Sequence, residues 1–281
     1  MLKLVDVKRM DLKRRWYEFK RDFRLMFGLI DRQILSQQQK IICFSHHKCA
    51  TKWTGQILEA LCDELEWNCF WGYRPITDTE LSNLEKKYHV IFFHRSEPGD
   101  FPGKFDGKNF KGFHVIRDPR DILVSQYFSH MQSHELNRYT QDIEADRAYL
   151  NTHSKEEGLL YMMEYSRHFI KTMACFERWP FDDGRLLELK FEDLVKDPFQ
   201  QWQRILTFIE MPVGNQVLEK ILARYSFKAL QSRQKDKSLS HYRSGRHRDF
   251  EDHFTPRIKA AFKEKFGLLL VRLNYETSHH W

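Results

Sequence analysis

One lysine follows a short apolar run near the start of the sequence. The stretch Ile41–Trp53, IICFSHHKCATKW, changes from apolar to polar at Ser45 and then carries Lys48. A buried strand that passes through a polar turn into a helix places that turn beyond the strand's carboxyl end. The first N–H groups of a helix lack partners within it and attract an anion, and Lys48 adds a mobile positive charge. The stretch predicts a phosphate-binding turn.

This turn differs from a Walker A loop. The pattern G-x-x-x-x-G-K-[ST] is absent, and Cys49 follows the lysine where a magnesium-binding hydroxyl is expected. The turn therefore favours an anionic nucleotide that is held without Mg²⁺. The two histidines and two cysteines of the stretch do not fall in the spaced pairs typical of zinc ligands, so no metal is predicted.

A second stretch with phosphate-binding residue types is His114–His130, HVIRDPRDILVSQYFSH. An apolar run ends at Arg117, Pro119 interrupts it, and Asp121 is suited to cap the helix that follows. Ser125 lies one turn further, so the arginine and this hydroxyl can both face the strand ends. An arginine fork with a hydroxyl suits a phosphate monoester.

The third stretch, His241–Thr255, reads HYRSGRHRDFEDHFT. Three arginines surround Gly245, and a glycine allows the backbone to approach an anion closely. Those arginines are Arg243, Arg246 and Arg248. The stretch predicts a third anion-binding segment.

Taken together and in this order, the three stretches resemble the PAPS-dependent sulfotransferase family. The family's motifs K-S-G-T-T-W, R-x-x-x-D-x-x-x-S and R-x-G each have a counterpart here. The counterparts are Lys48–Trp53, then Arg117 with Asp121 and Ser125, and then Arg243–Gly245, with smaller similarities at Phe191–Pro198 (FEDLVKDP) and Tyr225–Phe227 (YSF). The resemblance covers roughly residues 40–275.

The resemblance implies a donor, 3′-phosphoadenosine 5′-phosphosulfate (PAPS), with PAP as its product. Lys48 is expected to contact the oxygen that bridges phosphate and sulfate. The 5′-phosphate is expected to bind the amides of Cys49, Ala50, Thr51, Lys52 and Trp53 and the Thr51 hydroxyl. The 3′-phosphate is expected to bind Arg117, Ser125, Arg243, Ser244 and Gly245, and the adenine to lie between Trp53 and Phe227.

The implied reaction is in-line transfer of a sulfuryl group to a hydroxyl or amine of a small molecule, catalysed by positioning and electrostatics. The acceptor's proton needs a base, and the resemblance assigns this role to His94, which follows the apolar run Tyr88–Phe93. An imidazole with a pKa near neutrality suits acid–base work. Glu97 is the alternative, because some branches of the family use a carboxylate.

The sequence also departs from the family pattern. Ala50 stands where the family has glycine, so its backbone is predicted to avoid a conformation that only glycine tolerates. Lys52 replaces a threonine and either reinforces phosphate binding or faces solvent. Phe92 replaces a lysine of many cytosolic members, and His46-His47 replaces a common Tyr-Pro.

Short apolar runs alternate with helical patterns along the body of the chain. This alternation predicts an α/β fold, a three-layer P-loop-like domain with a central parallel sheet flanked by helices. The segment from 132 to 157 is predicted to be a loop or a poorly packed helix and a candidate lid. Strands are predicted at 41–44, 88–93, 112–116 and 186–189, and helices at 51–65, 121–131, 158–179, 216–225, 256–273 and after a cap at Asp197.

Positive charge is concentrated in the first residues. Of the net charge of +7, residues 1–24 supply nine basic minus four acidic side chains, or +5, which leaves +2 for the rest. The body is therefore not a broadly basic nucleic-acid binder. Residues 1–38 are predicted to form a basic amphipathic helical segment that either packs on the body or contacts a membrane surface or a partner, and residues 39–281 to form the sulfotransferase-like domain.

Five cysteines without a C-x-x-C pair, and no apolar run long enough to span a bilayer, favour a reduced, cytoplasmic location. The acceptor's identity and the oligomeric state are left open. A set of aromatic residues either lines an acceptor pocket or belongs to the core: Phe70, Trp71, Tyr73, Phe92, Phe93, Tyr127, Phe128 and Tyr139. The competing interpretations are a P-loop-like small-molecule kinase and a non-enzymatic nucleotide- or membrane-binding module.

Overall fold

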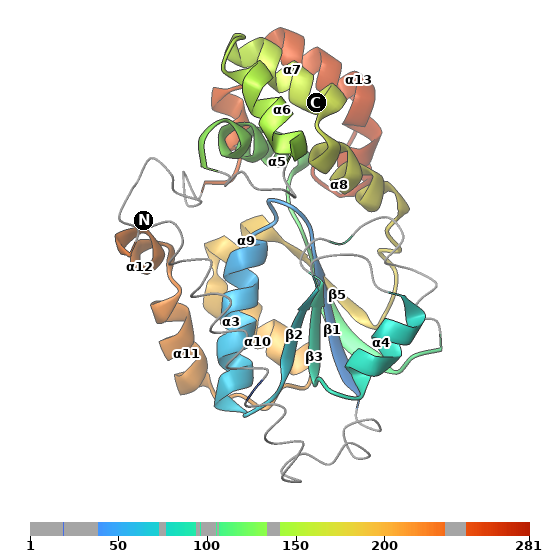
Figure 1. Cartoon of the computed structure of the whole chain (residues 1–281), viewed down its shortest axis with the longest axis vertical. Helices are drawn as coiled ribbons and strands as arrows, with labels where there is room; N and C mark the ends of the chain where they lie inside the picture. The colour runs from blue at the N-terminus through green and yellow to red at the C-terminus, as the bar shows by residue number, and fades with distance from the viewer. Residues whose placement is uncertain are drawn as a thin grey trace.

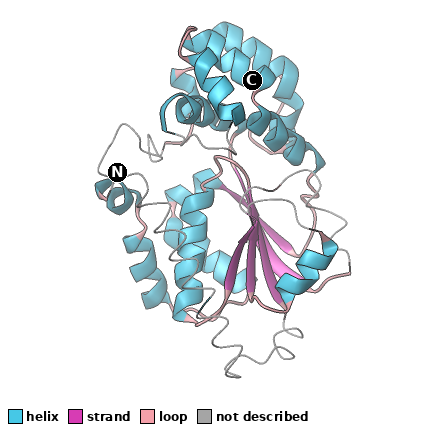
Figure 2. Cartoon of the chain, viewed as in Figure 1, coloured by secondary structure: helices cyan, strands magenta, loops and turns pink. Residues whose placement is uncertain are grey.

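A parallel sheet forms the centre of the molecule (Figures 1 and 2). The computed structural model describes residues 19, 39–72, 77–93, 96, 105, 107–133, 141–233 and 246–281. In this part of the chain the sheet has five strands in the order β2-β3-β1-β4-β5, and every neighbouring pair is parallel. The strands are β1 (Lys40–Ser45), β2 (Cys69–Gly72), β3 (Val90–Phe93), β4 (Phe110–Ile116) and β5 (Leu186–Lys190). The predicted α/β fold is confirmed, although β2 was not predicted.

Strand β1 occupies the middle of the sheet. Phe44 pairs with Phe93 of β3 on one side and with His114 of β4 on the other. After β1 the chain builds β2 and β3 on one side and then crosses to β4 and β5. Open α/β sheets bind ligands at such a reversal, beyond the carboxyl ends of the strands. The turns that follow β1 and β4 therefore lie at the place where a ligand is expected.

Helices cover both faces of the sheet because β1 is apolar on both. Ile41 and Cys43 belong to one hydrophobic cluster, and Ile42 and Phe44 to the other. The helices α3 (Thr51–Glu64), α10 (Pro198–Phe208) and α11 (Asn215–Arg224) lie on one side, and α4 (Asp78–Glu85) lies on the other (Figure 1). Gly55 lets α3 pack closely, since a Cβ there would lie 2.3 Å from the Trp71 ring.

A second group of helices gathers beyond the carboxyl ends of the strands, at the top of Figure 1. It consists of α5 (Pro119–Phe128), the π-helical turn η1 (Ser129–Ser133), α6 (Gln141–Leu150), α7 (Lys155–Tyr165), α8 (Arg167–Arg178) and α13 (Pro256–Arg272). The short elements α9 (Phe191–Lys196), α12 (Phe227–Ser232) and η2 (Asp249–Asp252) complete the described part. The predicted cap of α10 is confirmed, since the Asp197 carboxylate accepts the Gln200 N–H.

Three sequence-based predictions about these helices were wrong. The helix predicted at 158–179 is two helices, α7 and α8, because Ser166 is extended (φ −69°, ψ 109°) and its hydroxyl donates to Asp146. Helix α5 is capped by Asp118 rather than Asp121. The segment 132–157, predicted to be a loop or a poorly packed helix, contains the helix α6 at 141–150, and the expected poor packing is wrong because α6 buries Ile143 and Leu150.

The predicted basic helix at 1–38 lies outside the described residues, except for Phe19. Among the helices that the structure describes, none has the length and apolar character needed to cross a bilayer. The same residues contain no group of three or more His, Cys, Asp or Glu side chains arranged to hold a metal ion.

Candidate nucleotide-binding site

The turn between β1 and α3 has an unusual backbone. Lys48 (φ 67°) and Ala50 (φ 56°) are both in the left-handed region. The prediction that Ala50 avoids this conformation was therefore wrong. The left-handed conformation costs an L-residue about 1–2 kcal/mol. Interactions elsewhere in the turn must hold it in place.

The carbonyl of His46 supplies much of that support. It accepts the Thr51 hydroxyl at 2.7 Å and the Cys49 N–H at 3.0 Å. Ser45 Oγ donates to the Cys49 carbonyl at 3.1 Å. The proton of the Thr51 hydroxyl is therefore used within the turn. Ala50 is the N-cap of α3 and provides no side-chain cap, so the first amides of α3 stay available beyond the strand ends.

The ring of His46 is anchored beneath the turn by residues that the sequence analysis did not identify. His46 Nε2 lies 2.7 Å from His114 Nε2, and His114 Nδ1 lies 2.6 Å from Glu188 Oε2. Trp179 donates to the second Glu188 oxygen at 2.9 Å. Burial and the neighbouring His114 lower the pKa of His46 well below its usual value. The sequence feature that could have identified this network is a polar residue within each of two otherwise apolar strands, His114 in β4 and Glu188 in β5.

The turn after β4 contacts the turn after β1 directly. The buried Arg117 side chain donates through Nη1 to the Lys48 carbonyl at 3.2 Å. Its guanidinium also lies over the Phe191 ring at 4.5 Å. Ser125 is half-buried on α5, the helix that Arg117 precedes. These contacts join the first two predicted phosphate-binding stretches in one place.

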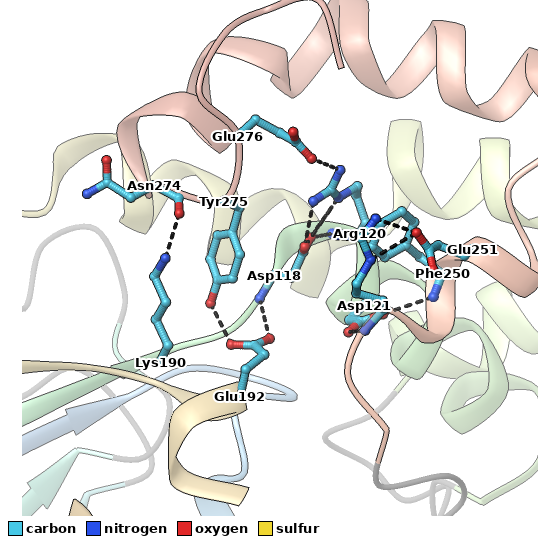
Figure 3. Close-up of polar contacts among 11 residues, drawn as sticks. Asp118, Arg120, Asp121, Lys190, Glu192, Phe250, Glu251, Asn274, Tyr275 and Glu276 are labelled. Carbon is cyan, nitrogen blue, oxygen red and sulfur yellow. Dashed lines mark hydrogen bonds and ion pairs between the residues drawn. The ribbon is translucent and has the colours of Figure 1, made fainter. Parts of the chain in front are cut away.

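Asp121 ties the C-terminal arginine segment to α5 (Figure 3). Its two carboxylate oxygens accept the N–H groups of Arg248 and Phe250, each at 2.9 Å. Burial raises the pKa of Asp121 to about 6, although the Arg117 charge acts in the opposite direction. The third predicted stretch is thereby linked to the second.

The described arginines of that third stretch pair with nearby carboxylates. Arg246 lies 2.6 Å from Asp252, and Arg248 pairs with Glu251. Their guanidinium groups are thus engaged on the η2 turn. Arg243, Ser244 and Gly245 lie outside the described residues.

A second polar network packs the C-terminal residues against the turn after β4 (Figure 3). Arg120 is buried and joins Asp118 at 2.7 Å and Glu276 at 2.5 Å. Glu192 accepts the Asp118 N–H at 3.1 Å and the Tyr275 hydroxyl at 2.8 Å. Burial raises the pKa of Glu192 and, more strongly, that of Tyr275, so the phenol remains a neutral donor.

The remaining predicted site residues differ in their settings. The Trp53 indole donates to the Tyr225 carbonyl at 2.8 Å, which brings α3 beside the segment that leads to the exposed Phe227. Lys52 is exposed. His94 and Glu97 lie outside the described residues.

The aromatic residues that were assigned either to a pocket or to the core belong mainly to the core. Phe92, Phe93 and Tyr127 are buried. Partly buried Phe70, Trp71 and Phe128 pack against the core clusters. Tyr73 and Tyr139 lie outside the described residues.

The protein is a three-layer α/β protein with a central parallel sheet. A P-loop-like turn lies where the strand order of this sheet reverses, and Arg117 and the first amides of α3 flank it, so this turn is a candidate anion site. The model of the sulfotransferase domain matches residues 38–274, and the chain therefore belongs to the sulfotransferase family. Membership supports an enzyme of the sulfotransferase type.

Individual relatives are distant. Mouse Sulfotransferase 2A6 is 26% identical over 210 residues, which are 69% of this chain and 66% of the relative. Human Sulfotransferase 2A1 is 23% identical over 243 residues, 81% of this chain and 77% of the relative.

The fold is similar to that of solved sulfotransferases. Mouse SULT7A1 complexed with PAP has a TM-score of 0.61 at 20% identity, covering 84% of this chain and 85% of the other. Retinol dehydratase in complex with androsterone and PAP has a TM-score of 0.55 at 13% identity, covering 82% and 80%. At such low identity these likenesses establish the shared fold.

Proposed function

We propose that residues 39–281 transfer the sulfuryl group of PAPS to a hydroxyl of a small-molecule acceptor. The bond between the Arg117 guanidinium and the Lys48 carbonyl carries the proposal, because it joins the two ends of the anion site. One end has an ammonium and helix amides, and the other has an arginine and a hydroxyl. This donor set fits a nucleotide with two separate phosphates and needs no metal ion to neutralise it.

Each residue of the site has a role in this proposal. Lys48 stabilises the negative charge that develops on the leaving 5′-phosphate, and the amides from Ala50 to Trp53 hold that phosphate. The Cys49 amide, which the sequence also assigned to the phosphate, instead donates to the His46 carbonyl. The 3′-phosphate lies against Arg117, Ser125 and the Arg243–Gly245 segment. Trp53 and Phe227 hold the adenine. PAPS supplies the sulfuryl group when it is bound, and two solved structures with a similar fold contain PAP.

The base that takes the acceptor's proton is proposed from the resemblance to the family. His94 is proposed to take the acceptor's proton, with Glu97 as the alternative base. The retinol dehydratase structure contains androsterone, which supports a small organic acceptor for this chain as well. The acceptor oxygen would approach in line with the bond to the leaving phosphate.

Nucleotide binding is the first test. We expect PAP to raise the thermal midpoint strongly, adenosine 5′-phosphate to raise it less, and ATP with Mg²⁺ to have little effect. Labelled PAPS is then incubated with a panel of phenols, aliphatic alcohols and amines. Stabilisation by ATP–Mg²⁺ but not by PAP would support a kinase instead, and no nucleotide effect would support a non-enzymatic module.

Lys48→Met provides the mutational test. Removal of one preorganised charge at the leaving group is expected to slow transfer about 10²–10³-fold. PAP affinity should change much less, because the backbone amides remain. Lys52→Met is the matched control, since this neighbouring lysine is exposed. Equal rates in Lys48→Met and the wild type would contradict the proposed role.

A further inference from the structure

Three polar side chains are linked in a row beneath the turn between β1 and α3. Glu188 Oε2 lies 2.6 Å from His114 Nδ1, and His114 Nε2 lies 2.7 Å from His46 Nε2. Glu188 is on β5, His114 is its register partner on β4, and His46 directly follows β1. This row, which we call the Glu188 chain, therefore crosses three neighbouring strands of the sheet.

Aromatic rings hold the two imidazoles of the Glu188 chain in place. The Trp179 ring stacks on the His114 ring with centres 3.8 Å apart, and its indole N–H donates to Glu188 Oε1 at 2.9 Å. The Phe176 and Trp179 rings meet the His46 ring edge-on, with centres 4.8 Å and 5.8 Å away. Both histidines are fully buried, whereas the Glu188 side chain is 25% exposed. Of the three linked residues, only Glu188 reaches solvent.

The Glu188 carboxylate determines where the protons of the chain lie. An ionised carboxylate only accepts hydrogen bonds, so His114 carries a proton on Nδ1. A neutral His114 then accepts at Nε2 from His46, and a protonated His114 donates at Nε2 to His46. In both cases the carboxylate fixes which nitrogen of His114 is protonated, and through it the bond to His46.

His46 in turn controls the shape of the turn that follows it. Its carbonyl accepts the Cys49 N–H at 3.0 Å and the Thr51 hydroxyl at 2.7 Å. The same turn holds Lys48 and Ala50 in left-handed conformations. Such conformations persist only when the surrounding residues hold them in place. A shift of the His46 ring would therefore move its carbonyl and, with it, the first amides of α3.

The turn after β4 has a separate support. It is held by the contact of Arg120 with Asp118 at 2.7 Å and by the contact of Tyr275 with Glu192 at 2.8 Å. None of these four residues belongs to the Glu188 chain. A change in the Glu188 chain is therefore expected to act on the 5′-phosphate end of the site more than on the 3′-phosphate end.

On the basis of the function proposed above, we propose that Glu188 and His114 are positioning residues for the 5′-phosphate of the donor. The ionised Glu188 carboxylate holds His114, His114 holds the ring of His46, and His46 holds the turn in the conformation that presents the first amides of α3. Alanine stands at position 50, where the family has glycine, so this left-handed turn depends on such an anchor more than a glycine turn does.

Two adenosine phosphates separate the two ends of the site. Titration calorimetry of the full chain with PAP and with adenosine 3′-phosphate, which lacks the 5′-phosphate, measures both affinities. Glu188→Gln leaves one acceptor oxygen for two donors, so the bonds to His114 and Trp179 cannot both remain. We expect PAP affinity to fall about tenfold, roughly the effect of losing one hydrogen bond to a charged group, and adenosine 3′-phosphate affinity to stay within about twofold.

Two further variants accompany this test. Glu85→Gln is the matched control, because this carboxylate at the end of α4 is 20% exposed and pairs with Lys108 at 2.8 Å, and both of its affinities should equal those of the wild type. His114→Asn breaks the Glu188 chain at its other link, because asparagine is too short to reach His46. The same selective loss of PAP affinity is expected, and this variant provides the test if Glu188→Gln does not fold.

The outcomes separate this proposal from the function on which it rests. Wild-type PAP affinity in a folded Glu188→Gln or His114→Asn protein would overturn the positioning role. An equal loss for both nucleotides would overturn it as well, since that result indicates general destabilisation of the fold. Failure of the wild type to bind PAP would overturn the sulfotransferase function itself.

Discussion

Lys48 and Ala50 both hold left-handed backbone conformations in the turn that follows β1. Family relatives place glycine at the second of these positions, where the conformation costs less. Here the His46 carbonyl and its buried ring hold the turn instead, through Thr51, Cys49 and the His114–Glu188 pair. A strained backbone conformation persists in a turn only when interactions with the surrounding residues hold it in place.

Ala50→Gly is therefore expected to raise the free energy of unfolding by about 1 kcal/mol, because the left-handed penalty of alanine exceeds the entropy cost of glycine. Urea denaturation measures the change. Glu66→Gly, at the other end of α3 with φ 56°, is the matched control and should gain a similar amount. A loss of stability in Ala50→Gly alone would show that the alanine methyl supports the turn.

At the scale of elements, the segment after α13 packs against the turn after β4 and the end of β5. Tyr275 and Glu276 bind Glu192 and Arg120, and Lys190 donates to the Asn274 carbonyl at 2.6 Å. Arg120 also lies over the Phe250 ring at 4.1 Å. The C-terminal segment thus supports both turns expected to hold the 3′-phosphate.

Tyr275→Phe removes one hydrogen bond to the half-buried Glu192 carboxylate and is expected to cost about 1–3 kcal/mol of stability. It should also weaken PAP binding more than binding of adenosine 5′-phosphate, which lacks the 3′-phosphate. Calorimetric titration with both nucleotides measures this difference. Tyr165→Phe, on the exposed face of α7, is the control. An equal loss for the two nucleotides would contradict a specific role at the 3′-phosphate.

At the scale of the whole molecule, buried titratable groups have opposite effects on stability as the pH falls. His46 and His130 have pKa values lowered by burial, so they bind protons more tightly in the unfolded chain. Their contribution to stability is complete above the unfolded pKa near 6.5 and is lost as the pH falls through the folded pKa. Asp121 acts in the opposite sense, because its pKa is raised to about 6 and its protonation favours the folded chain.

The thermal midpoint is therefore expected to fall as the pH drops from about 7 to about 6, where the histidines dominate. His130→Gln should lessen this slope, and Asp121→Asn should steepen the loss below pH 6, since it removes the compensating carboxylate. Calorimetric scans across this range measure both effects. Parallel curves for the wild type and His130→Gln would show that this histidine does not contribute.

The sequence by itself determined the elements whose signal is local. The apolar run before Ser45 and the Asp197-Pro198 pair specify a buried strand and a helix start, and the three predicted phosphate-binding stretches indicate the family. Strand β2 and the break at Ser166 escaped prediction, because the first is short and the second depends on a bond to Asp146 on another helix.

The tertiary structure alone decided which polar residues meet. His47, His130 and His168 carry no common motif, and neither do Arg120, Glu192 and Tyr275, yet each set is assembled in one place. Chain separation hides such sets from any local pattern. Burial makes these contacts important for stability, because a polar group removed from water is costly unless it forms a hydrogen bond within the protein.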